Sequence, residues 1–531
     1  MGKHRDLLEE TLVRCYGHTS FRPGQRELME LVLSGQNALG LLATGGGKSL
    51  TYQLPSLLLP HLTVVVTPLI SLMIDQVQKL RQQGRRDVTY LNSALRPDEI
   101  RQQLQELRAG RYKLLYISPE KLQHPAVTAM LQERGVSLFA IDEAHCISQW
   151  GHDFRTDYLR LPAIVEALGS PPVLAVTATA TAAVAAEICE LFQIPPHHLV
   201  KQSLNRSNIT YDVYRVQAEQ EKLERLLSLL AVLDGAGIVY CSTRQAVEQV
   251  VRRCREAGMH DVHGYHGGMD AIERVLIQEQ FLRNKLRVII ATNAFGMGID
   301  KPDIRFVLHY QFPASLEAYV QEVGRIGRDG EPGYAGLFYW PEDGLIHQRL
   351  QERESLADDQ LKQFLALVQA GKTPGGAAGR LAAAELPAGI AENQLRALFF
   401  YAERAGVLAD VLPTKDGYQF RVCSAASADA LRQIAAELAR IQRVKQEKLA
   451  AIVSWLRQGG CLRRQLSAYF GEREEADAPA LGCCSACGFD RSRFWRRKQA
   501  ERQESGEKWQ LERALARLLG QKPLPQTGGQ P

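Results

Sequence analysis

A glycine-rich segment near the start of the chain has the residue types that hold phosphate groups. The run LLATGGGKS occupies residues 41–49 and ends in Lys48 and Ser49. Consecutive glycines let backbone N–H groups close around phosphate oxygens, the lysine adds positive charge, and the serine hydroxyl suits Mg²⁺. The generic loop has a glycine where this chain has Leu42, so the match depends on the GGGKS core. An ordinary glycine-rich turn before a helix is the alternative interpretation.

Two consecutive carboxylates end an apolar run further along the chain. The segment LFAIDEAH, residues 138–145, places Asp142 and Glu143 directly after four apolar residues. If that run is a strand, its end delivers Asp142 to a metal ion, and Glu143 is placed to orient or deprotonate an attacking water. Two acids at a strand end are an ordinary solvated feature by themselves. Downstream of a phosphate-binding loop, they predict the second half of a site that hydrolyses ATP.

Phosphoryl transfer also needs positive charge opposite the γ-phosphate as the transition state forms. The segment QEVGRIGRDG, residues 321–330, places Arg325 and Arg328 three residues apart. Residues with this spacing share one face if the segment is helical. The two arginines are therefore candidates for that charge, with an ordinary exposed basic turn as the alternative.

Cysteine spacing predicts a metal site in the last quarter of the chain. Cys483, Cys484 and Cys487 follow Cys461 within 26 residues. Four thiolates so close together suit a closed tetrahedral zinc site that holds a small segment with little core of its own. Oxidisable surface thiols are the alternative. The remaining six cysteines are scattered, which indicates a reducing compartment and buried apolar roles: Cys15, Cys146, Cys189, Cys241, Cys254 and Cys423.

The elements that would position these residues alternate between helix-period stretches and short β-branched runs. This pattern predicts parallel strands joined by helices, the α/β class. The first set of expected strands is Thr63–Thr67, Leu114–Ile117, Leu138–Ile141 and Val173–Val176. A second set repeats the pattern at Gly237–Tyr240, Val288–Ala291 and Phe306–His309. We therefore expect two α/β lobes, joined near residues 203–211.

Composition changes after Leu361, where AGKTPGGAAG, residues 370–379, indicates a flexible linker. Beyond it we expect a short helix, an amphipathic helix at Glu392–Arg404 and a hairpin that turns at Asp416 and Gly417. Helix, helix and hairpin is the order of a winged helix. A long helical pattern at Ala426–Leu456 then leads to the clustered cysteines.

Taken together, these segments resemble superfamily 2 helicases and, more closely, the RecQ family of DNA helicases. Motifs of that family follow one another in order over residues 16–330, and DEAHCISQWGHDFRTDY at residues 142–158 is the most diagnostic. The others are YGHTSFRPGQ, ATGGGKSLTYQLP, VVVTPLISLMIDQV, YISPEKL, TATAT, YCSTR, YHGGM, ATNAFGMGIDKPDIRFVLHY and QEVGRIGRDG. The resemblance implies two RecA-like lobes, which close on Mg-ATP and move along single-stranded DNA.

The resemblance assigns roles to the matching positions. Gln25 is expected to hydrogen-bond the adenine base, and Gln321 to position the phosphate or water. Catalysis is expected from Lys48, Asp142, Glu143, Gln321, Arg325 and Arg328, with Ser49 and Asp142 holding Mg²⁺. ATP is expected at Arg22, Gln25, Thr44, Gly45, Gly46, Gly47, Lys48, Ser49 and Asp300.

An aromatic segment follows the acid pair. Four of its residues, Trp150, His152, Phe154 and Arg155, lie beside the expected ATP site in a loop that contains a glycine. This loop could stack on bases of single-stranded DNA and signal that contact to Glu143 and His145. Two core aromatics are the alternative from the residues alone; the resemblance favours the coupling role.

The accessory region departs from the family in two ways. The usual cysteine spacing would place a zinc ligand at Leu481, whereas this chain has LGCCSAC, so Cys483 is the candidate to replace it and the joint ligation by Cys483 and Cys484 stays open. In better-known members the zinc segment closely follows the second lobe and a winged helix comes after it. Here the winged-helix candidate precedes the cysteines, which puts its role in prying duplexes apart in doubt.

We expect lobes at residues 1–205 and 206–369, a winged-helix-like domain at 370–425, a helical zinc-binding domain at 426–490 and a basic, partly disordered tail at 491–531. The 531 residues carry a net charge of +5, and ten basic against four acidic residues give the segment 491–522 a charge of +6. Within it, RSRFWRRK at residues 491–498 suits either phosphate contacts with base stacking or a cationic helix end whose aromatics dock on the zinc domain.

No apolar run approaches the length of a membrane span, and MGKHRDLLEE lacks the apolar region of a secretory signal. We expect a cytoplasmic protein, associated with the nucleoid in a bacterium, that uses ATP, Mg²⁺ and Zn²⁺ and binds single-stranded and tailed or branched duplex DNA. Strand separation in recombination, repair or replication is the expected activity, and the resemblance implies 3′ to 5′ polarity. An RNA helicase, a translocase or annealing factor that does not separate strands, and a nucleotide-switched DNA-binding regulator are the rivals.

Overall fold

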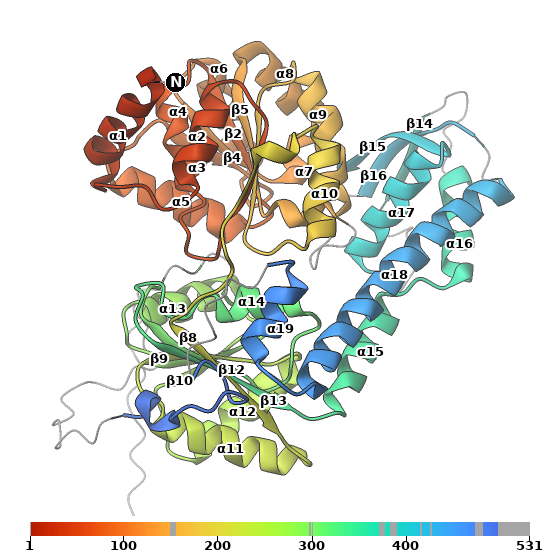
Figure 1. Cartoon of the computed structure of the whole chain (residues 1–531). Helices are drawn as coiled ribbons and strands as arrows, with labels where there is room; N and C mark the ends of the chain where they lie inside the picture. The colour runs from red at the N-terminus through yellow and green to blue at the C-terminus, as the bar shows by residue number, and fades with distance from the viewer. Residues whose placement is uncertain are drawn as a thin grey trace, which may run out of the picture. The chain divides into compact units, whose positions relative to one another are not determined.

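The computed structural model describes residues 2–148, 155–296, 299, 301–370, 378–382, 390–414, 417–424, 427–472 and 482–496. These residues form two compact units (Figure 1). The first contains the described residues of 1–204, 348–451 and 469–472, and the second those of 205–347, 452–468 and 473–531. Within the described ranges, no helix has both the length and the apolar character that a membrane crossing requires.

The first unit is built on a seven-stranded parallel sheet with the order β3-β4-β2-β5-β6-β1-β7. The four strands that the sequence predicted here are confirmed, with ends that differ by at most two residues. Near-continuous apolar runs form these strands because both faces of the sheet are covered. The strands are β1 (Ala38–Leu41), β2 (Leu62–Val66), β3 (Val88–Leu91), β4 (Leu114–Ile117), β5 (Val136–Asp142), β6 (Val173–Thr177) and β7 (Leu199–Lys201).

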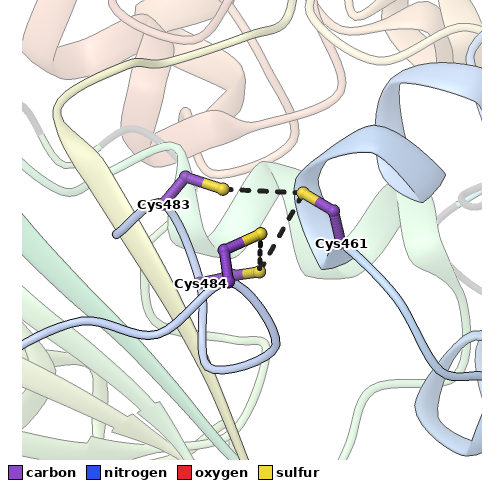
Figure 2. Close-up of side chains that lie close together, drawn as sticks. Cys461, Cys483 and Cys484 are labelled. Atoms are coloured by element: carbon purple, nitrogen blue, oxygen red, sulfur yellow. Dashed lines mark hydrogen bonds between the residues drawn. The ribbon is translucent and has the colours of Figure 1, made fainter. Parts of the chain in front are cut away.

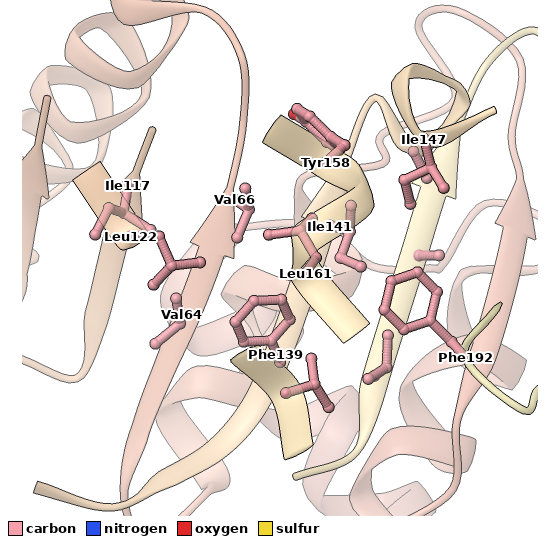
Figure 3. Close-up of a cluster of buried hydrophobic side chains, with 14 of the residues drawn as sticks. Val64, Val66, Ile117, Leu122, Phe139, Ile141, Ile147, Tyr158, Leu161 and Phe192 are labelled. Carbon is pink, nitrogen blue, oxygen red and sulfur yellow. The ribbon is translucent and has the colours of Figure 1, made fainter. Parts of the chain in front are cut away.

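Two hydrophobic cores cover the two faces of this sheet. Successive strand residues point to opposite faces, so Phe139 and Ile141 belong to one core while Leu138 and Ala140 belong to the other. Figure 3 shows part of the first core. It is covered by α6 (Pro97–Arg108), α7 (Pro119–Leu122), α8 (Pro125–Arg134), η1 (Ala144–Ile147), η2 (Thr156–Arg160), α9 (Leu161–Ala167) and α10 (Ala182–Leu191). The second is covered by α2 (Gln25–Leu33), α3 (Leu50–Gln53) and α5 (Ile70–Gln82), with α1 (Gly2–Tyr16) and α4 (Pro55–Leu58) outside them.

The second unit contains a six-stranded parallel sheet with the order β10-β11-β9-β12-β13-β8. Its strands are β8 (Ile209–Arg215), β9 (Ala236–Tyr240), β10 (Val262–Tyr265), β11 (Val288–Ala291), β12 (Ile304–His309) and β13 (Gly333–Tyr339). Its helices are α11 (Glu219–Val232), α12 (Arg244–Glu256), α13 (Ala271–Leu282) and α14 (Leu316–Val323). The second predicted set of strands is thus confirmed, and with it the α/β class with two parallel-sheet lobes.

A small antiparallel sheet follows along the chain. Strands β14 (Ala378–Ala382), β16 (Gly417–Val422) and β15 (Leu408–Thr414) lie side by side in that order, and α17 (Glu392–Arg404) packs on them. The predicted hairpin and amphipathic helix are confirmed, but residues 378–382 pair with β16 as a strand where the sequence suggested a linker and a short helix. We call α16 (Asp358–Ala370), β14, α17, β15 and β16 the three-stranded domain.

The three-stranded domain has its own core. Phe364 of α16, Phe399 of α17 and Phe420 of β16 pack in it, and the first part of α18 (Ala428–Arg457) contributes Ile434. Helix α16, which the sequence placed in the second lobe, thus packs with α17 and the small sheet. Helix and sheet order match the expected winged helix, with one strand more than predicted. Asp416 of the expected turn lies outside the described residues.

The described segment after α18 belongs to the second unit, except for residues 469–472. Helix α19 (Leu462–Tyr469) begins directly after Cys461, and the described residues 482–496 lie against the sheet of the second lobe. Residues 491–494 form a short helical turn, η5. Phe494 packs on Tyr334 of β13 with ring centroids 5.3 Å apart and on Phe489 with ring centroids 6.2 Å apart. This aromatic thus contacts both the second lobe and the zinc domain, in line with the docking interpretation of RSRFWRRK. Trp495 remains 47% exposed.

Candidate functional site

The carboxyl ends of β1, β6 and β5 bring together three of the predicted motifs. These strands are neighbours in the parallel sheet, and ligands of such sheets bind beyond the carboxyl ends of the strands. The glycine-rich loop follows β1, the acid pair ends β5, and Thr177 ends β6. One edge of the first unit therefore carries the phosphate-binding loop and the carboxylates.

The glycine-rich loop has the backbone of a phosphate cradle. Gly45 and Gly47 have φ angles of 83° and 76°, a region that side chains disfavour. A Cβ atom on Gly46 would lie 2.8 Å from the carbonyl oxygen of Ala43. The loop therefore needs glycine at each of these positions, and its shape fits the phosphates of a nucleotide.

The lysine of this loop meets the acid pair. The Lys48 Nζ atom lies 3.3 Å from Oε1 of Glu143, and both side chains are about 15% exposed. Glu143 itself has a left-handed backbone with φ of 50°, which is uncommon outside glycine and is found at functional sites. Two predicted catalytic residues from distant parts of the chain are thus in contact.

Asp142 is a buried carboxyl group with few interactions that offset the cost of burying its negative charge. Tyr52 is 3.4 Å away and donates a hydrogen bond to Oδ2, and the backbone N–H of Glu143 donates to Oδ1 at 3.0 Å. Burial, and after it the negative charge of Glu143, raise the pKa of Asp142 to about 6, while Lys48 opposes the rise. A divalent cation beside Asp142 would relieve this cost, so the donor set of Asp142 and the Ser49 hydroxyl fits Mg²⁺.

His145 connects the acid pair to the end of β6. Its Nδ1 atom lies 2.8 Å from the Thr177 hydroxyl and 3.4 Å from Oε2 of Glu143, and the ring is fully buried. The imidazole of His145 thus connects Thr177, at the end of β6, to Glu143, the proposed catalytic base. This arrangement suits the coupling role expected of His145.

The amino-terminal motif packs against the glycine-rich loop. Gln25 is buried, and its side-chain amide donates to the carbonyl oxygens of Gly46 at 3.1 Å and Gly47 at 2.9 Å. Arg22 donates to the carbonyl oxygen of Gly45. Both residues therefore lie at the phosphate loop, and adenine recognition by Gln25 stays a prediction.

Several predicted residues lie outside the described part of the chain. Arg155 is described, and its guanidinium donates to the carbonyl oxygen of Pro68 at 3.4 Å. The undescribed residues are Trp150, His152 and Phe154 of the expected coupling loop, and Asp300.

The two candidate arginines lie in a turn and not on a helix. Helix α14 ends at Val323, and Gly327 in the following turn has a φ of 51°. Arg325 is 4% exposed; it donates to the Tyr240 hydroxyl at 3.0 Å and to the Gly296 carbonyl oxygen. Arg328 donates to the carbonyl oxygen of Ile299 at 2.9 Å. The helical face that the spacing suggested is absent, yet Arg325 reaches Gly296 and Arg328 reaches nearby Ile299. Gln321 lies in α14, just before this turn.

All four clustered cysteines come together in the second unit. Their Sγ atoms lie within 4.8 Å of one another, with Cys461 3.5 Å from Cys483 and 4.0 Å from Cys484 (Figure 2). Cys487 lies 3.5 Å from Cys484. Sulfurs at about 2.3 Å from a tetrahedral ion are about 3.8 Å apart, so these distances fit Zn²⁺. Cys483 and Cys484 both reach the site, as the sequence left open.

The thiols differ in their surroundings. Burial raises the pKa of the Cys483 thiol to about 11. Burial acts in the same direction on Cys484, but the backbone N–H groups of Leu462, Cys487 and Ala486 outweigh it and lower the pKa of that thiol. Of these two thiols, Cys484 therefore gives up its proton to a metal ion more readily.

Two kinds of site residue were not predicted from the sequence. Tyr52 and Tyr158 donate hydrogen bonds to the side chain and the backbone carbonyl of Asp142, and Tyr52 could have been found from its place just after the GGGKS core. Arg206 and Asn208 hold the arginine turn and lie in the polar join between the lobes, NRSN. The available signal was the polar composition of residues 205–208 in the join between the two lobes.

Three protein families match this chain. Residues 22–188 match the DEAD/DEAH box helicases, residues 220–330 the helicase conserved C-terminal domain, and residues 427–490 the RecQ zinc-binding domain. Residues 331–426, which include the three-stranded domain, lie between the second and the third match. The matched ranges cover most strands of the two sheets, except β7, β8 and β13, and all four clustered cysteines.

Proteins of similar sequence agree with these family matches. The chain is 38% identical over 507 residues to the probable ATP-dependent DNA helicase RecS of Bacillus subtilis. This alignment covers 95% of this chain and 97% of that protein. It is 41% identical to the ATP-dependent DNA helicase RecQ of Haemophilus influenzae over 66% of this chain and 56% of that protein. A structure of the Mycobacterium smegmatis helicase Lhr bound to ssDNA and AMP-PNP has a TM-score of 0.53 at 19% identity, over 81% of this chain and 61% of that one, which shows a shared fold.

Proposed function

This chain belongs to the RecQ family of ATP-dependent DNA helicases, and on that basis we propose that it hydrolyses ATP to move along single-stranded DNA and separate the strands of duplex DNA. Its substrates are single-stranded and tailed or branched duplex DNA, in recombination, repair or replication. Movement runs 3′ to 5′. In a bacterium the protein works at the nucleoid.

The proposed chemistry assigns one task to each residue. Lys48 and the backbone of Gly45, Gly46 and Gly47 bind the phosphates, and Ser49 and Asp142 hold Mg²⁺, which neutralises phosphate charge when bound. Glu143 accepts the proton of the attacking water. Thr44 and Arg22 support the phosphate loop, and Gln25 binds the base.

Residues of the second unit complete the reaction in this proposal. Arg325 and Arg328 stabilise the charge that develops on the γ-phosphate, with Gln321 and Asp300 beside them. The loop with Trp150, His152, Phe154 and Arg155 contacts single-stranded DNA and signals that contact through His145. Zn²⁺ at the four clustered cysteines stabilises the fold around α19.

The observation that carries the proposal is the contact between Lys48 and Glu143 at 3.3 Å, next to a buried Asp142 whose pKa is raised. A phosphate-binding lysine, a metal-binding carboxylate and a candidate base at one strand edge are what phosphoryl transfer requires. A DNA-binding regulator needs no such base.

The test is an unwinding assay with ATP and Mg²⁺ on a duplex with a 3′ single-stranded tail, beside the same duplex with a 5′ tail. Strand separation on the 3′-tailed duplex alone, lost in Lys48→Ala, is the expected result. ATP hydrolysis that rises with DNA but separates neither substrate would contradict the helicase proposal and support a translocase. Hydrolysis that DNA does not stimulate would support a nucleotide-switched regulator.

A further inference from the structure

Arg206 holds the turn that carries the two candidate arginines. Its guanidinium donates to the carbonyl oxygens of Gly324 at 3.3 Å, Ile326 at 2.9 Å and Gly327 at 2.7 Å. These three residues flank Arg325 on both sides. One planar side chain therefore fixes the backbone from which that arginine extends.

Asn208 fixes the same turn from its other side. Its side-chain amide donates to the carbonyl oxygens of Gly327 at 2.9 Å and Glu331 at 2.8 Å. Position 327 needs glycine, because φ is 51° and a Cβ atom there would clash with the Glu331 carbonyl oxygen and lie 2.6 Å from the Asn208 Nδ2 atom. Residues 206–208 thus add side-chain hydrogen bonds to the few backbone hydrogen bonds that the turn makes, such as that from Ile326 to Val323 at 3.0 Å.

The backbone of Arg206 is in turn held by the zinc domain. Arg463, in the first turn of α19, is 9% exposed and donates to the carbonyl oxygen of Arg206 at 2.7 Å. The same guanidinium donates to the Asn205 side chain and to the carbonyl oxygen of Ile209. Arg463 is two residues from Cys461, so the position of α19 follows that of the metal site.

The cysteine loop also pairs directly with the second lobe. The backbone N–H of Tyr211 donates to the carbonyl oxygen of Cys483 at 3.2 Å, and that of Ser485 donates to the carbonyl oxygen of Tyr211 at 2.9 Å. Tyr211 lies in β8, and its ring lies 5.2 Å from the Arg463 guanidinium. Two contacts, at β8 and at residues 205–209, therefore connect the metal site to the segment that begins the second lobe.

We propose that Arg206 and Arg463 are positioning residues that connect the zinc site to the turn of Arg325 and Arg328, so that the zinc domain supports ATP hydrolysis as well as folding. The inference rests on the proposed function, because it matters only if these arginines act on the γ-phosphate. Side-chain misplacement of about 1 Å can cost 100-fold in rate without loss of the fold. Effects are therefore expected on turnover and not on nucleotide affinity.

The decisive variant is Arg206→Lys in the full, zinc-loaded chain. Lysine keeps the charge but cannot donate to three carbonyl groups from one plane. We expect the turnover of ATP at saturating ATP and DNA to fall about 10- to 100-fold. The affinity for ADP stays unchanged, whereas the affinity for ADP with aluminium fluoride falls, because only a transition-state analogue uses the arginine charge. Arg463→Lys changes the same quantities in the same direction.

Arg253→Lys is the matched control, since the Arg253 side chain on α12 is 43% exposed and its one ion pair within the described part of the chain is with Glu256, at 2.9 Å. Zinc content and thermal unfolding temperature are measured for every variant. A double variant with Arg325→Ala tests the route: if Arg206 acts through Arg325, adding Arg206→Lys lowers turnover no further.

Each outcome decides the matter. Turnover of Arg206→Lys within twofold of the control overturns the inference, and so does a loss that accompanies zinc release or unfolding, since the role would then be structural alone. Equal losses in affinity for ADP and for the analogue overturn it as well. If the wild-type chain itself shows no DNA-stimulated hydrolysis, the proposed function has failed and not this inference.

Discussion

Lys48 and Glu143 form an ion pair between the phosphate loop and the end of β5, with 3.3 Å between Nζ and Oε1. A phosphate group that enters the loop competes with this carboxylate for the ammonium. In the proposed mechanism, a phosphate that binds the lysine releases Glu143 to face the attacking water. The pair thus links nucleotide binding to the freeing of the candidate base.

Glu143→Gln should separate binding from hydrolysis. We expect DNA-stimulated turnover to fall about 100- to 10,000-fold, since general-base catalysis contributes that much. ATP affinity should be unchanged or tighter, because the amide no longer competes for Lys48. Single-turnover hydrolysis and equilibrium nucleotide binding measure the two quantities. Glu166→Gln, at an exposed position on α9, is the control. A variant that loses ATP affinity in step with turnover would contradict a role as base.

The Mg²⁺ requirement should steepen in mild acid. Burial and Glu143 raise the pKa of Asp142 to about 6, so a larger fraction of this carboxyl is protonated at pH 6 than of an ordinary aspartate. Mg²⁺ needs the carboxylate, and below this pKa the Mg²⁺ concentration for half-maximal hydrolysis should rise about tenfold per pH unit. Mg²⁺ titrations at pH 5.5, 6.5 and 7.5 measure it, and nucleotide alone in solution corrects for its phosphates. A half-maximal concentration that does not change with pH contradicts the assignment of Asp142.

The strands and the strand-end motifs could be predicted because each rests on local sequence. A strand buried on both faces has a continuous apolar run, as Val136–Asp142 does, and the carboxyl ends of parallel strands meet at one edge. The motifs at those ends therefore had to come together. The same holds for the cysteines, whose number and spacing leave few arrangements.

Features set by distant contacts could not be predicted. Residues 378–382 form a strand only because β16 pairs with them, with Gly379 opposite Phe420. In the turn after α14, Gly327 has a left-handed backbone, and its carbonyl oxygen accepts hydrogen bonds from the side chains of Arg206 and Asn208. In both cases the deciding partner is far away in the sequence, where period and propensity carry no information.

Substitution of the clustered cysteines should show which of them bind the ion. We expect one Zn²⁺ per chain in the wild type and a loss of most of it in Cys483→Ser and in Cys484→Ser, because both sulfurs lie in the cluster. Metal analysis of the purified variants measures this. Cys423→Ser is the control, since Cys423 is exposed and outside the cluster. Full zinc content in Cys483→Ser would show that three cysteines and another ligand suffice.

A buried ion pair anchors α15 (Asp343–Glu354) to α11. Nζ of Lys222 lies 2.8 Å and 2.9 Å from the two carboxylate oxygens of Asp343, and both side chains are about 1% exposed. Lys222→Met leaves the carboxyl buried alone and should lower the free energy of unfolding by about 3–5 kcal/mol at pH 7.5. Urea unfolding followed by tryptophan fluorescence measures it, since Trp340 lies 4.9 Å from the ammonium.

The pH dependence of that variant has a definite sign. Burial raises the pKa of Asp343 to about 6 even beside Lys222, and without the lysine the pKa should be higher. Protonation removes the uncompensated charge, so the deficit of Lys222→Met should shrink as the pH falls from 7.5 to 5.5. The double variant Lys222→Met, Asp343→Leu should be close to wild type at both values. A deficit that persists in the double variant would mean that packing, and not charge, holds α15.

The three-stranded domain is tied to the first lobe by charged contacts of α17. Arg396 donates to Glu120 at 2.9 Å and to Asp157 of η2 at 3.1 Å, and Arg160 pairs with Glu403 at 2.5 Å. Helix η2 begins two residues after Phe154, where the expected DNA-coupling loop ends. A winged helix could use side chains of α17 to contact DNA. Several of these side chains, however, contact protein here.

Arg396→Ala should loosen this attachment without unfolding either part. The side chain is 30% exposed, so we expect a loss of only about 1 kcal/mol, which corresponds to a roughly fivefold rise in amide exchange rates in α17 and η2. Hydrogen exchange followed by mass spectrometry measures both segments. Arg421→Ala is the control, because Arg421 forms an exposed pair with Asp410 on the small sheet. If α17 exchanges faster but η2 does not, the domain does not brace the segment behind the coupling loop. Faster exchange in both, together with altered DNA stimulation of ATP hydrolysis, would place the three-stranded domain in the coupling between DNA and ATP.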